Sequence, residues 1–254
     1  MIEHLLYPHI APRFLSTEKY RNGHLRVLNA LPYRRVLGLH SPDMKNIAKE
    51  LSENGQELIK RFEQQPSNEL FYEETVIWGF LINLCKCSLE ERFKMLEQYI
   101  PVIDNWGVCD SYCAHAKWME RADKQQLWNF IERWFDSANE FEVRFAIIVS
   151  MCRFLNEEWL DKVFLRIGKL DLERIKSNYK SVKGKPVAPQ QGTVQGKEPY
   201  YVRMGIAWLL ATALFKFPQQ TREFVGKSHL PEDVIKLYVR KARESFRTKT
   251  IKAI

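Results

Sequence analysis

Apolar residues recur along most of this chain at steps of three and four positions, a spacing that places them on one face of an α-helix. In residues 42–54, for example, Met44, Ile47, Ala48 and Leu51 share a face. No segment shows the sustained alternation of a half-buried β-strand. The sequence therefore predicts an all-α protein, and the helical pattern is strongest in residues 42–54, 92–100, 124–135, 140–155, 157–170, 199–217 and 231–246.

Residues that favour helix starts precede several of these segments. Ser41 is expected to be an N-cap, with Pro42 in the first turn of the helix. Ser88 and Glu91 have the S-x-x-E spacing of a capping box, in which each side chain accepts a hydrogen bond from the other residue's backbone. Further caps are expected at Asp104 or Asn105 and at Asp123.

The series amounts to about a dozen helices joined by short loops. It predicts an α-solenoid, in which antiparallel helix pairs stack around a concave surface, with degenerate repeats because no strict period is present. A globular helical bundle is the alternative. Residues 1–254 are expected to form a single domain. Only residues 181–199 lack apolar periodicity, and their Gly, Pro, Gln and Lys content predicts a flexible loop inserted between two packed helices.

The net charge of +8 favours an acidic partner. Nucleic acid is the leading candidate, because its phosphates reward many Lys and Arg contacts through counterion release. From Gln219 onward, nine Lys and Arg stand against four Asp and Glu, so this end is expected to contact a DNA backbone. Many basic proteins of this size bind no nucleic acid, so charge alone does not decide the partner.

The cysteines and the apolar stretches favour a cytoplasmic protein. Five cysteines, an odd number, are most simply explained as reduced thiols. The first residues lack the features of a signal peptide, and the apolar stretch at residues 204–215 is too short to span a bilayer. A cytoplasmic monomer without membrane contact is expected.

Several enzyme motifs do not occur in the sequence, among them GxSxG, GxGxxG, the P-loop and HExxH. A zinc site formed by cysteines and His115 is disfavoured. Cys85 and Cys87 would point to nearly opposite sides of a helix, and neither they nor Cys109 and Cys113 have the CxxC spacing. No metal or cofactor is expected.

Trp106 and Asp110 are four residues apart, so a helix would place them on one face, separated by about 6 Å. Asp is a mediocre helix former, so propensity does not explain this pair. One interpretation is a buried tryptophan beside a surface aspartate that caps or pairs. The other is a functional carboxylate beside an aromatic ring. The spacing alone favours the first interpretation.

Two later positions bear on this choice. Arg144 lies in the middle of an otherwise apolar segment, FEVRFAII, where a buried arginine needs a partner. It could extend its charge to solvent or pair with a neighbouring helix. Trp208 lies in the nearly all-apolar segment YYVRMGIAWLL, where on its own it would be interpreted as a core residue.

These segments together resemble the bacterial alkylpurine DNA glycosylases of the AlkD type, a family of DNA alkylation-repair proteins built from HEAT-like repeats. The resemblance extends across most of the chain. Residues 18–51 look like the family's opening, in which a VLG-type turn precedes a proline-started basic helix. The other similar segments are DNWGVCDS for the N-W-x-x-x-D motif, FEVRFAII for the central arginine helix, YYVRMGIAWLL for the late tryptophan helix and RESFRTKT for the closing basic helix.

The resemblance implies a right-handed HEAT-like solenoid with a basic, concave DNA-binding face, and it implies a role for several residues. Asp110 would be the catalytic carboxylate, and Trp106 and Trp208 would flank the deoxyribose of the lesion. His40 departs from the arginine that the family often has, and the loop at residues 181–199 looks longer than usual. Phosphate contacts are expected from Arg34, Arg35, Lys45 (where another arginine is common), Lys117, Arg144 and Arg203.

The implied reaction is chemically consistent with these residue types. A purine alkylated at N7 or N3 is cationic and leaves as a neutral base, so no general acid is needed. The sugar acquires oxocarbenium character, which a carboxylate such as Asp110 can stabilise while it positions water. Aromatic faces add cation–π attraction of about 0.5–2 kcal/mol each. Whether the base is flipped is left open by the sequence, although the resemblance implies that flipping is unnecessary.

Three hypotheses follow. The first is a monofunctional glycosylase that removes N3- or N7-alkylpurines from double-stranded DNA in the bacterial cytoplasm and leaves an abasic site. The second is a non-catalytic helical scaffold that binds duplex, branched or damaged DNA. The third is a protein-interaction solenoid, whose concave face would be apolar or acidic. The joint presence of Trp106, Asp110, Arg144 and Trp208 favours the first.

Overall fold

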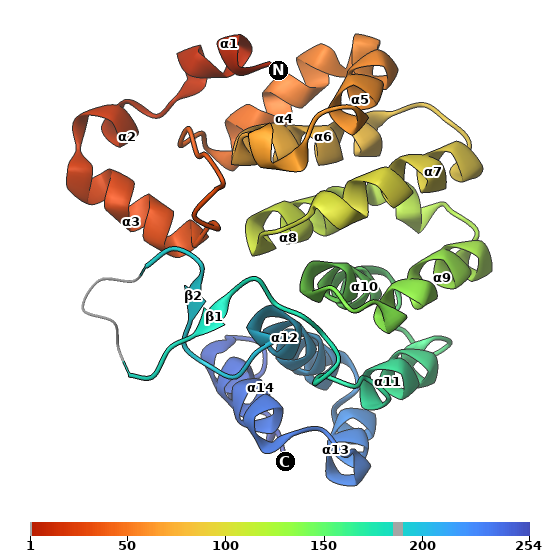
Figure 1. The fold of residues 1–254 in the computed structure, drawn as a ribbon. Coiled ribbons are helices and arrows are strands. Elements are labelled where there is room, and N and C mark those ends of the chain that lie inside the picture. The colour runs from red at the N-terminus through yellow and green to blue at the C-terminus, as the bar shows by residue number, and fades with distance from the viewer. Residues whose placement is uncertain (1, 185–189) are drawn as a thin grey trace. The chain divides into compact units, whose positions relative to one another are not determined.

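The computed structural model describes residues 2–184 and 190–254, and these residues are almost entirely helical (Figure 1). They divide into two compact units. The first unit contains the described residues of 1–122 and 182–193, and the second contains residues 123–181 and 194–254. The all-α fold class predicted from the sequence is confirmed. Among the described helices, none combines the length and apolar character that crossing a bilayer requires.

The first unit holds eight α-helices linked by short 3-10 turns. They are α1 (Glu3–Leu6), α2 (Pro12–Ser16), α3 (Glu18–Leu28), α4 (Ser41–Glu50), α5 (Gly55–Glu63), α6 (Tyr72–Leu84), α7 (Leu89–Tyr99) and α8 (Trp106–His115).

The second unit holds six further α-helices and most of a two-stranded ribbon. They are α9 (Lys124–Glu132), α10 (Glu140–Arg153), α11 (Leu160–Gly168), α12 (Tyr200–Lys216), α13 (Pro218–Lys227) and α14 (Glu232–Glu244), with strands β1 (Lys180–Ser181) and β2 (Thr193–Val194).

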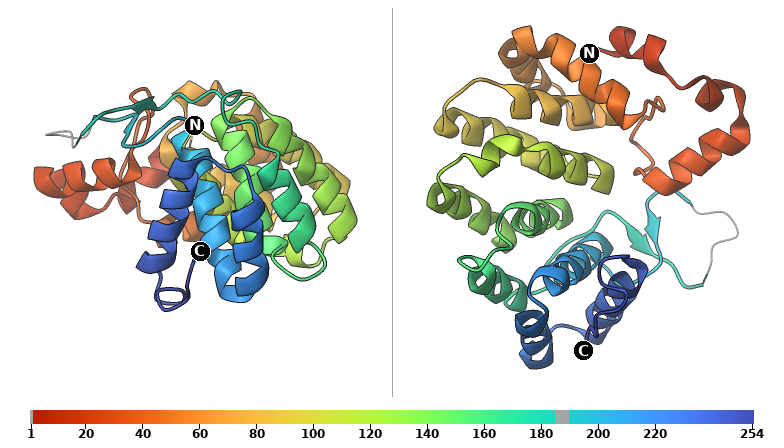
Figure 2. Two further views of the ribbon diagram at one scale, coloured as in Figure 1. Left: turned by 90° about the horizontal axis from the view of Figure 1, so that it is seen from below. Right: turned by 180° about the vertical axis from the view of Figure 1, so that it is seen from behind.

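Within each unit, alternate helices pack side by side. In the first unit α6 packs against both α4 and α8, while α5 and α7 contact one another and α6. In the second unit α12 lies between α10 and α14 and packs against both (Figure 2). Such rows of alternate helices are what stacked helix pairs produce, so the packing is consistent with an α-solenoid. The even-numbered helices also carry Trp106, Asp110, Arg144 and Trp208.

Most of the predicted helix starts are confirmed. Ser88 and Glu91 form the capping box of α7. Of the two candidates before α8, Asn105 is the cap, because its side chain accepts a hydrogen bond from the Gly107 N–H at 2.7 Å. The cap of α9 is also as predicted. The prediction for α4 is wrong by one residue: Ser41 is the first helical residue, because the extended backbone that precedes the helix ends at His40.

The described residues of the segment 181–199 include part of a two-stranded ribbon. The strands β1 and β2 pair with one another, which apolar periodicity could not reveal because each strand is only two residues long. The carboxylate of Glu198 also accepts a hydrogen bond from the Ser181 N–H at 2.7 Å. Residues 185–189, which belong to the segment predicted to be flexible, lie outside the described residues.

Two buried carboxylates at the start of α6 hold the N-terminal segments of the first unit. Glu73 is fully buried and accepts hydrogen bonds from the backbone N–H groups of Leu37, Gly38 and Leu39 at 2.7–3.3 Å. Glu74 accepts from the Ile2 N–H at 2.7 Å. Burial raises the pKa of Glu73, and the backbone donors oppose this shift. Glu73 therefore provides acceptors for a turn that has no other secondary structure to satisfy it.

We expect Glu73→Ala to lower the free energy of unfolding by at least about 2 kcal/mol, because several buried N–H groups lose their acceptor. Glu73→Gln keeps an acceptor oxygen and carries no charge, so it should be much better tolerated. Because burial raises the pKa of Glu73, the stability of the wild type relative to Glu73→Gln should fall as the pH rises from the ordinary value of 4.5 through the raised pKa. Denaturant unfolding over this pH range measures both effects. Equal stability of the alanine variant and the wild type would contradict this role.

Candidate active site and nucleic-acid interface

Trp106 and Asp110 lie one turn apart at the start of α8. Trp106 is the first helical residue, and its indole Nε1–H donates to the Leu28 carbonyl at 3.0 Å. The side-chain amide of Asn105 donates to the same carbonyl at 2.9 Å. Both side chains of the pair are half-buried rather than one in the core and one at the surface. The end of α3 therefore fixes the orientation of the tryptophan ring.

A buried ion pair holds the backbone just before α8. Arg34 and Asp104 are both almost fully buried, and the guanidinium donates to one carboxylate oxygen at 2.7 and 3.0 Å. The hydroxyl of Tyr33 donates to the same oxygen at 3.0 Å. Burial and the charge of Asp104 raise the pKa of Tyr33 to about 12. Arg34 also donates to the carbonyls of Ser67 and Leu70, so its guanidinium is used inside the first unit.

An open cleft of about 850 Å³, lined in part by Trp106, lies wholly within the first unit. Trp106 and Tyr72 contribute aromatic side chains to its lining, and Ser111 lies directly after Asp110. The described lining includes three cationic side chains and no carboxylate. The lining residues from α2 to the start of α4 that carry polar or charged groups are Arg13, Thr17, Lys19, Tyr20, His24, Arg26, His40 and Ser41. An aromatic and cationic lining suits an anionic, base-containing ligand.

Tyr72 lines the cleft, and its phenol is close enough to Asp110 to be affected by the negative charge of that carboxylate. It is buried, and burial raises the pKa of its phenol, with the negative charges of Glu73 and Asp110 adding to the shift. The hydroxyl lies so close to Gly107 that a Cβ added there would stand 2.5 Å from the oxygen. Tyr72 therefore stays protonated and places a neutral hydroxyl group near Asp110.

Two imidazoles, those of His24 and His40, also line the cleft. His40 Nε2 lies 3.5 Å from the hydroxyl of Tyr20. His24 packs edge-on against Phe14, and burial together with the nearby His40 lowers its pKa. The imidazole of His24 is thus favoured in its neutral form.

Arg144, in the second unit, is 3 % exposed and lies between α10 and α12. Its guanidinium donates to the Tyr201 carbonyl at 2.6 Å and lies 5.8 Å from the centre of the Tyr201 ring. One turn earlier, Glu140 accepts from the Tyr201 N–H at 2.6 Å. Arg144 and Glu140 therefore bind the carbonyl and the N–H of Tyr201, in the first turn of α12. This burial argues against the direct phosphate contact expected for Arg144 and favours the alternative, a pairing with a neighbouring helix.

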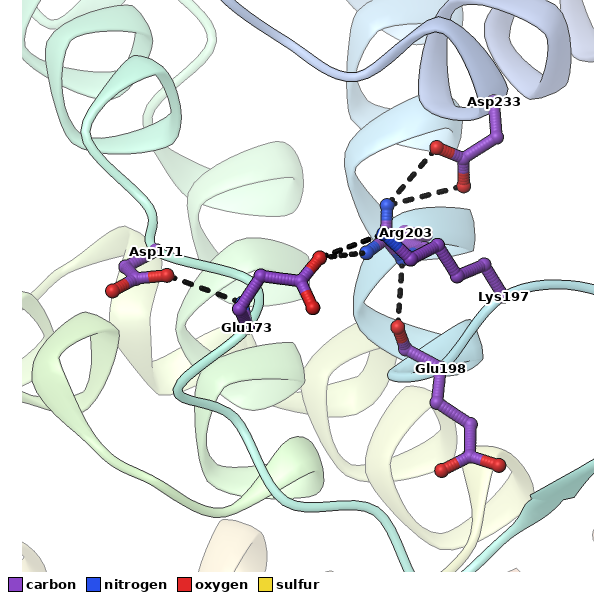
Figure 3. A network of polar contacts seen from close by, with 6 residues as sticks. All are labelled: Asp171, Glu173, Lys197, Glu198, Arg203 and Asp233. Carbon is purple, nitrogen blue, oxygen red and sulfur yellow. Dashed lines mark hydrogen bonds and ion pairs between the residues drawn. The ribbon is translucent and has the colours of Figure 1, made fainter.

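Arg203 is also enclosed, at the centre of a polar network (Figure 3). Its side chain is fully buried and donates to both carboxylate oxygens of Asp233 at 3.0 and 3.1 Å. It also donates to the Glu198 carbonyl at 3.0 Å and lies 3.5 Å from Glu173, which is bound by Lys197 at 2.7 Å. The expected phosphate contact is not supported here either, because the guanidinium joins α12 to α14 and to the preceding loop.

The remaining predicted contacts are more accessible. Arg35 is exposed, and its guanidinium stacks 4.0 Å from the centre of the Phe71 ring. Lys117 is exposed directly after α8, and Lys45 is half-buried on α4. Trp208, expected to flank the lesion, is 39 % exposed on α12 and so is not the core residue that its segment alone would indicate. It belongs to the second unit, whereas Trp106 and Asp110 belong to the first.

The cysteines do not lie as the spacing argument assumed. Cys85 and Cys87 follow the end of α6 and lie in a loop rather than on a helix, because the helix ends at Leu84. Cys109 and Cys113 are buried one turn apart in α8. Within residues 2–184 and 190–254, no group of three or more potential ligands is close enough to hold a metal ion.

The sequence matches the family model described as "DNA alkylation repair enzyme" over residues 22–175. This match covers more than half of the chain, and the protein belongs to that family. The matched residues include Trp106, Asp110 and Arg144, whereas Trp208 lies beyond them. Membership supports a role in DNA alkylation repair with DNA as the partner, and it agrees with the HEAT-like helical fold. Comparisons with curated proteins and with solved structures found no match.

Sequence reasoning missed Tyr72 and the wall of the cleft formed by α3. Tyr72 begins α6, a helix buried on almost every side, so the three-and-four spacing that identified other helices is weak there. The signal that remained was a pair of glutamates, Glu73 and Glu74, directly before a long apolar run, which is typical of a helix start.

Arg34 and Arg35 provide a matched test of burial against DNA contact. We expect Arg34→Gln to lower the free energy of unfolding by about 3 kcal/mol, because it leaves Asp104 buried without its main partner. Arg35→Gln should change stability little and instead weaken binding to duplex DNA with a shallower salt dependence. Denaturant unfolding and fluorescence anisotropy separate the two effects. The reverse pattern would overturn the assignment of Arg34 to the fold.

Gly107 tests the position of Tyr72. We expect Gly107→Ala to destabilise the protein by about 1–3 kcal/mol, because the new methyl group overlaps the Tyr72 hydroxyl in a packed site. Tyr72→Phe removes the nearest oxygen, so the double variant should recover most of the lost stability. A double-mutant cycle of unfolding free energies measures this coupling. Additive effects of the two substitutions would show that the contact is unimportant.

Proposed function

We propose that this protein is a monofunctional DNA glycosylase that hydrolyses the N-glycosidic bond of cationic N3- or N7-alkylpurines in duplex DNA and leaves an abasic site. The observation that carries the proposal is the arrangement at the start of α8. Trp106 lines an aromatic, cationic cleft, and Asp110 lies one turn further along the same helix. Family membership supports the repair role, and the resemblance to AlkD-type enzymes supports the chemistry.

In this proposal Asp110 stabilises the positive charge that develops on the deoxyribose as the bond to the base stretches. The alkylated purine leaves as a neutral base, so the reaction needs a carboxylate and a water molecule rather than a general acid. Asp110 would also position the water that attacks the sugar. Tyr72 contributes a neutral hydroxyl beside the carboxylate and does not compete with it for the positive charge.

Trp106 would hold its ring against the sugar in an orientation that the Leu28 carbonyl has already fixed. The ring face attracts developing positive charge by cation–π interaction of about 0.5–2 kcal/mol. Trp208 is proposed as the second aromatic wall on the strength of the resemblance, and its partial exposure leaves the indole available to a ligand. Arg13, Lys19 and Arg26 along the cleft, with Arg35, Lys45 and Lys117, would contact phosphates.

One observation favours a second candidate, a scaffold that binds DNA without cleaving the glycosidic bond. Arg144, which the resemblance makes a phosphate contact, is buried and bonded to Tyr201. A protein with this arrangement could grip duplex DNA through its exposed cations alone.

We expect Asp110→Asn to lower the rate of 7-methylguanine release from duplex DNA by about 10²–10³-fold, because the carboxylate that stabilises the sugar is lost. Affinity for the same duplex should change little. Glu50→Gln, which removes an exposed carboxylate from α4, is the matched control and should retain wild-type rates. Single-turnover assays of base release and anisotropy measure the two quantities. Wild-type protein that binds duplex DNA but releases no base would favour the scaffold.

A further inference from the structure

The second unit exposes three large aromatic side chains, two on α12 and one just after α14. Phe246 is 85 % exposed, Phe215 47 % and Trp208 39 %. Trp208 and Phe215 are seven residues apart on α12, which places them on the same face, about two turns from each other. Exposed apolar side chains that gather on one surface, rather than standing singly, mark interaction sites.

Cationic groups accompany these rings. The Arg247 guanidinium lies 5.6 Å from the centre of the Phe215 ring, which brings the residues after α14 against α12. The Lys249 ammonium lies 5.0 Å from the centre of the Phe246 ring. The nearby Glu244 is engaged by Lys241 at 3.1 Å and by Arg240 at 3.6 Å. The charge beside the rings is therefore positive.

The backbone that carries Phe246 is held in place rather than frayed. Thr248 is buried, and its hydroxyl donates to the Ala242 carbonyl at 2.7 Å. Further along, the hydroxyl of Tyr238 donates to the Ala253 carbonyl at 2.9 Å. Phe246 thus projects into solvent from an ordered turn, with 85 % of its surface exposed.

We propose that Phe215, Phe246, Arg247 and Lys249 form a binding surface for unpaired DNA, on which exposed bases stack while the cations contact phosphates. We call these four residues the C-terminal stacking surface. Alternating aromatic and cationic side chains are the features by which proteins bind single strands without sequence preference. The nine Lys and Arg against four Asp and Glu from residue 219 onward favour a polyanion over an apolar partner.

The inference rests on DNA binding and not on the glycosylase chemistry. Duplex DNA hides the faces of its bases, so exposed rings at this site gain most from nucleotides that are already unstacked. Such nucleotides occur at strand ends, at gaps and beside damaged pairs. The surface would therefore direct a DNA-repair protein toward DNA that has lost local pairing.

The test uses the full chain and fluorescein-labelled oligothymidylate of about ten nucleotides, a length within the site sizes of stacking surfaces. We expect the double variant Phe215→Ala/Phe246→Ala to weaken binding at least about tenfold. Phe246→Trp should bind as tightly as wild type, whereas Phe246→Leu should bind weakly, because leucine keeps apolar area without a ring face. Leu165→Ala, an exposed apolar residue elsewhere in the second unit, is the matched control.

The proposal is overturned if the double variant, or Phe246→Leu, binds the oligonucleotide as tightly as the wild type. It is also overturned if the double variant loses only binding to phosphatidylserine-containing vesicles, because the surface then binds lipid rather than DNA. Asp110→Asn should retain full affinity for the oligonucleotide. The double variant should retain base release from fully paired DNA. Failure of the glycosylase proposal therefore leaves this surface testable, and the reverse also holds.

Discussion

The first unit depends on one buried carboxylate, that of Glu73. Residues 37–39 have no helix or strand to satisfy their N–H groups, and Glu73 provides the acceptors from the first turn of α6. Gly38 adopts a φ of +89° there, with the Phe14 ring where a Cβ would stand, so the turn tolerates no larger residue. Leu39, the last residue of this turn, lines the cleft together with His40 and Ser41. The shape of the candidate site thus follows from a hydrogen-bonded turn at its edge.

The start of α8 is also held by polar groups from the segment between α3 and α4. Its start is fixed by Asn105, by the Arg34–Asp104 pair and by the indole of Trp106, and these groups bind residues between Leu28 and Arg34 or at the start of the helix itself. The segment between α3 and α4 therefore supports both the cleft and the helix that carries Asp110. The polar groups that hold the site are buried, whereas those proposed to meet DNA lie along the cleft or at the surface.

The sequence was sufficient for the fold class and for most helix starts, because apolar spacing and cap residues are local signals. Ser88 with Glu91, Asn105 and Asp123 behave as their types predict. Burial of individual arginines was not predictable in the same way. Arg34 and Arg203 look like surface cations by residue type, and for Arg144 the sequence offered pairing with a neighbouring helix only as one alternative. Each of the three is satisfied by groups distant in the sequence. Tyr72 was missed because a helix buried on nearly all sides lacks periodicity.

The path of the chain between the units has a consequence for synthesis. The described residues of 182–193 belong to the first unit, whereas the residues before and after this stretch belong to the second. Asn29, at the end of α3, binds this returning segment through the Gly192 N–H and the Thr193 carbonyl. During synthesis on the ribosome, the last segment of the first unit therefore becomes available only when about three quarters of the protein has been made. A nascent chain stalled before residue 193 would carry α3 without the contacts that close its end.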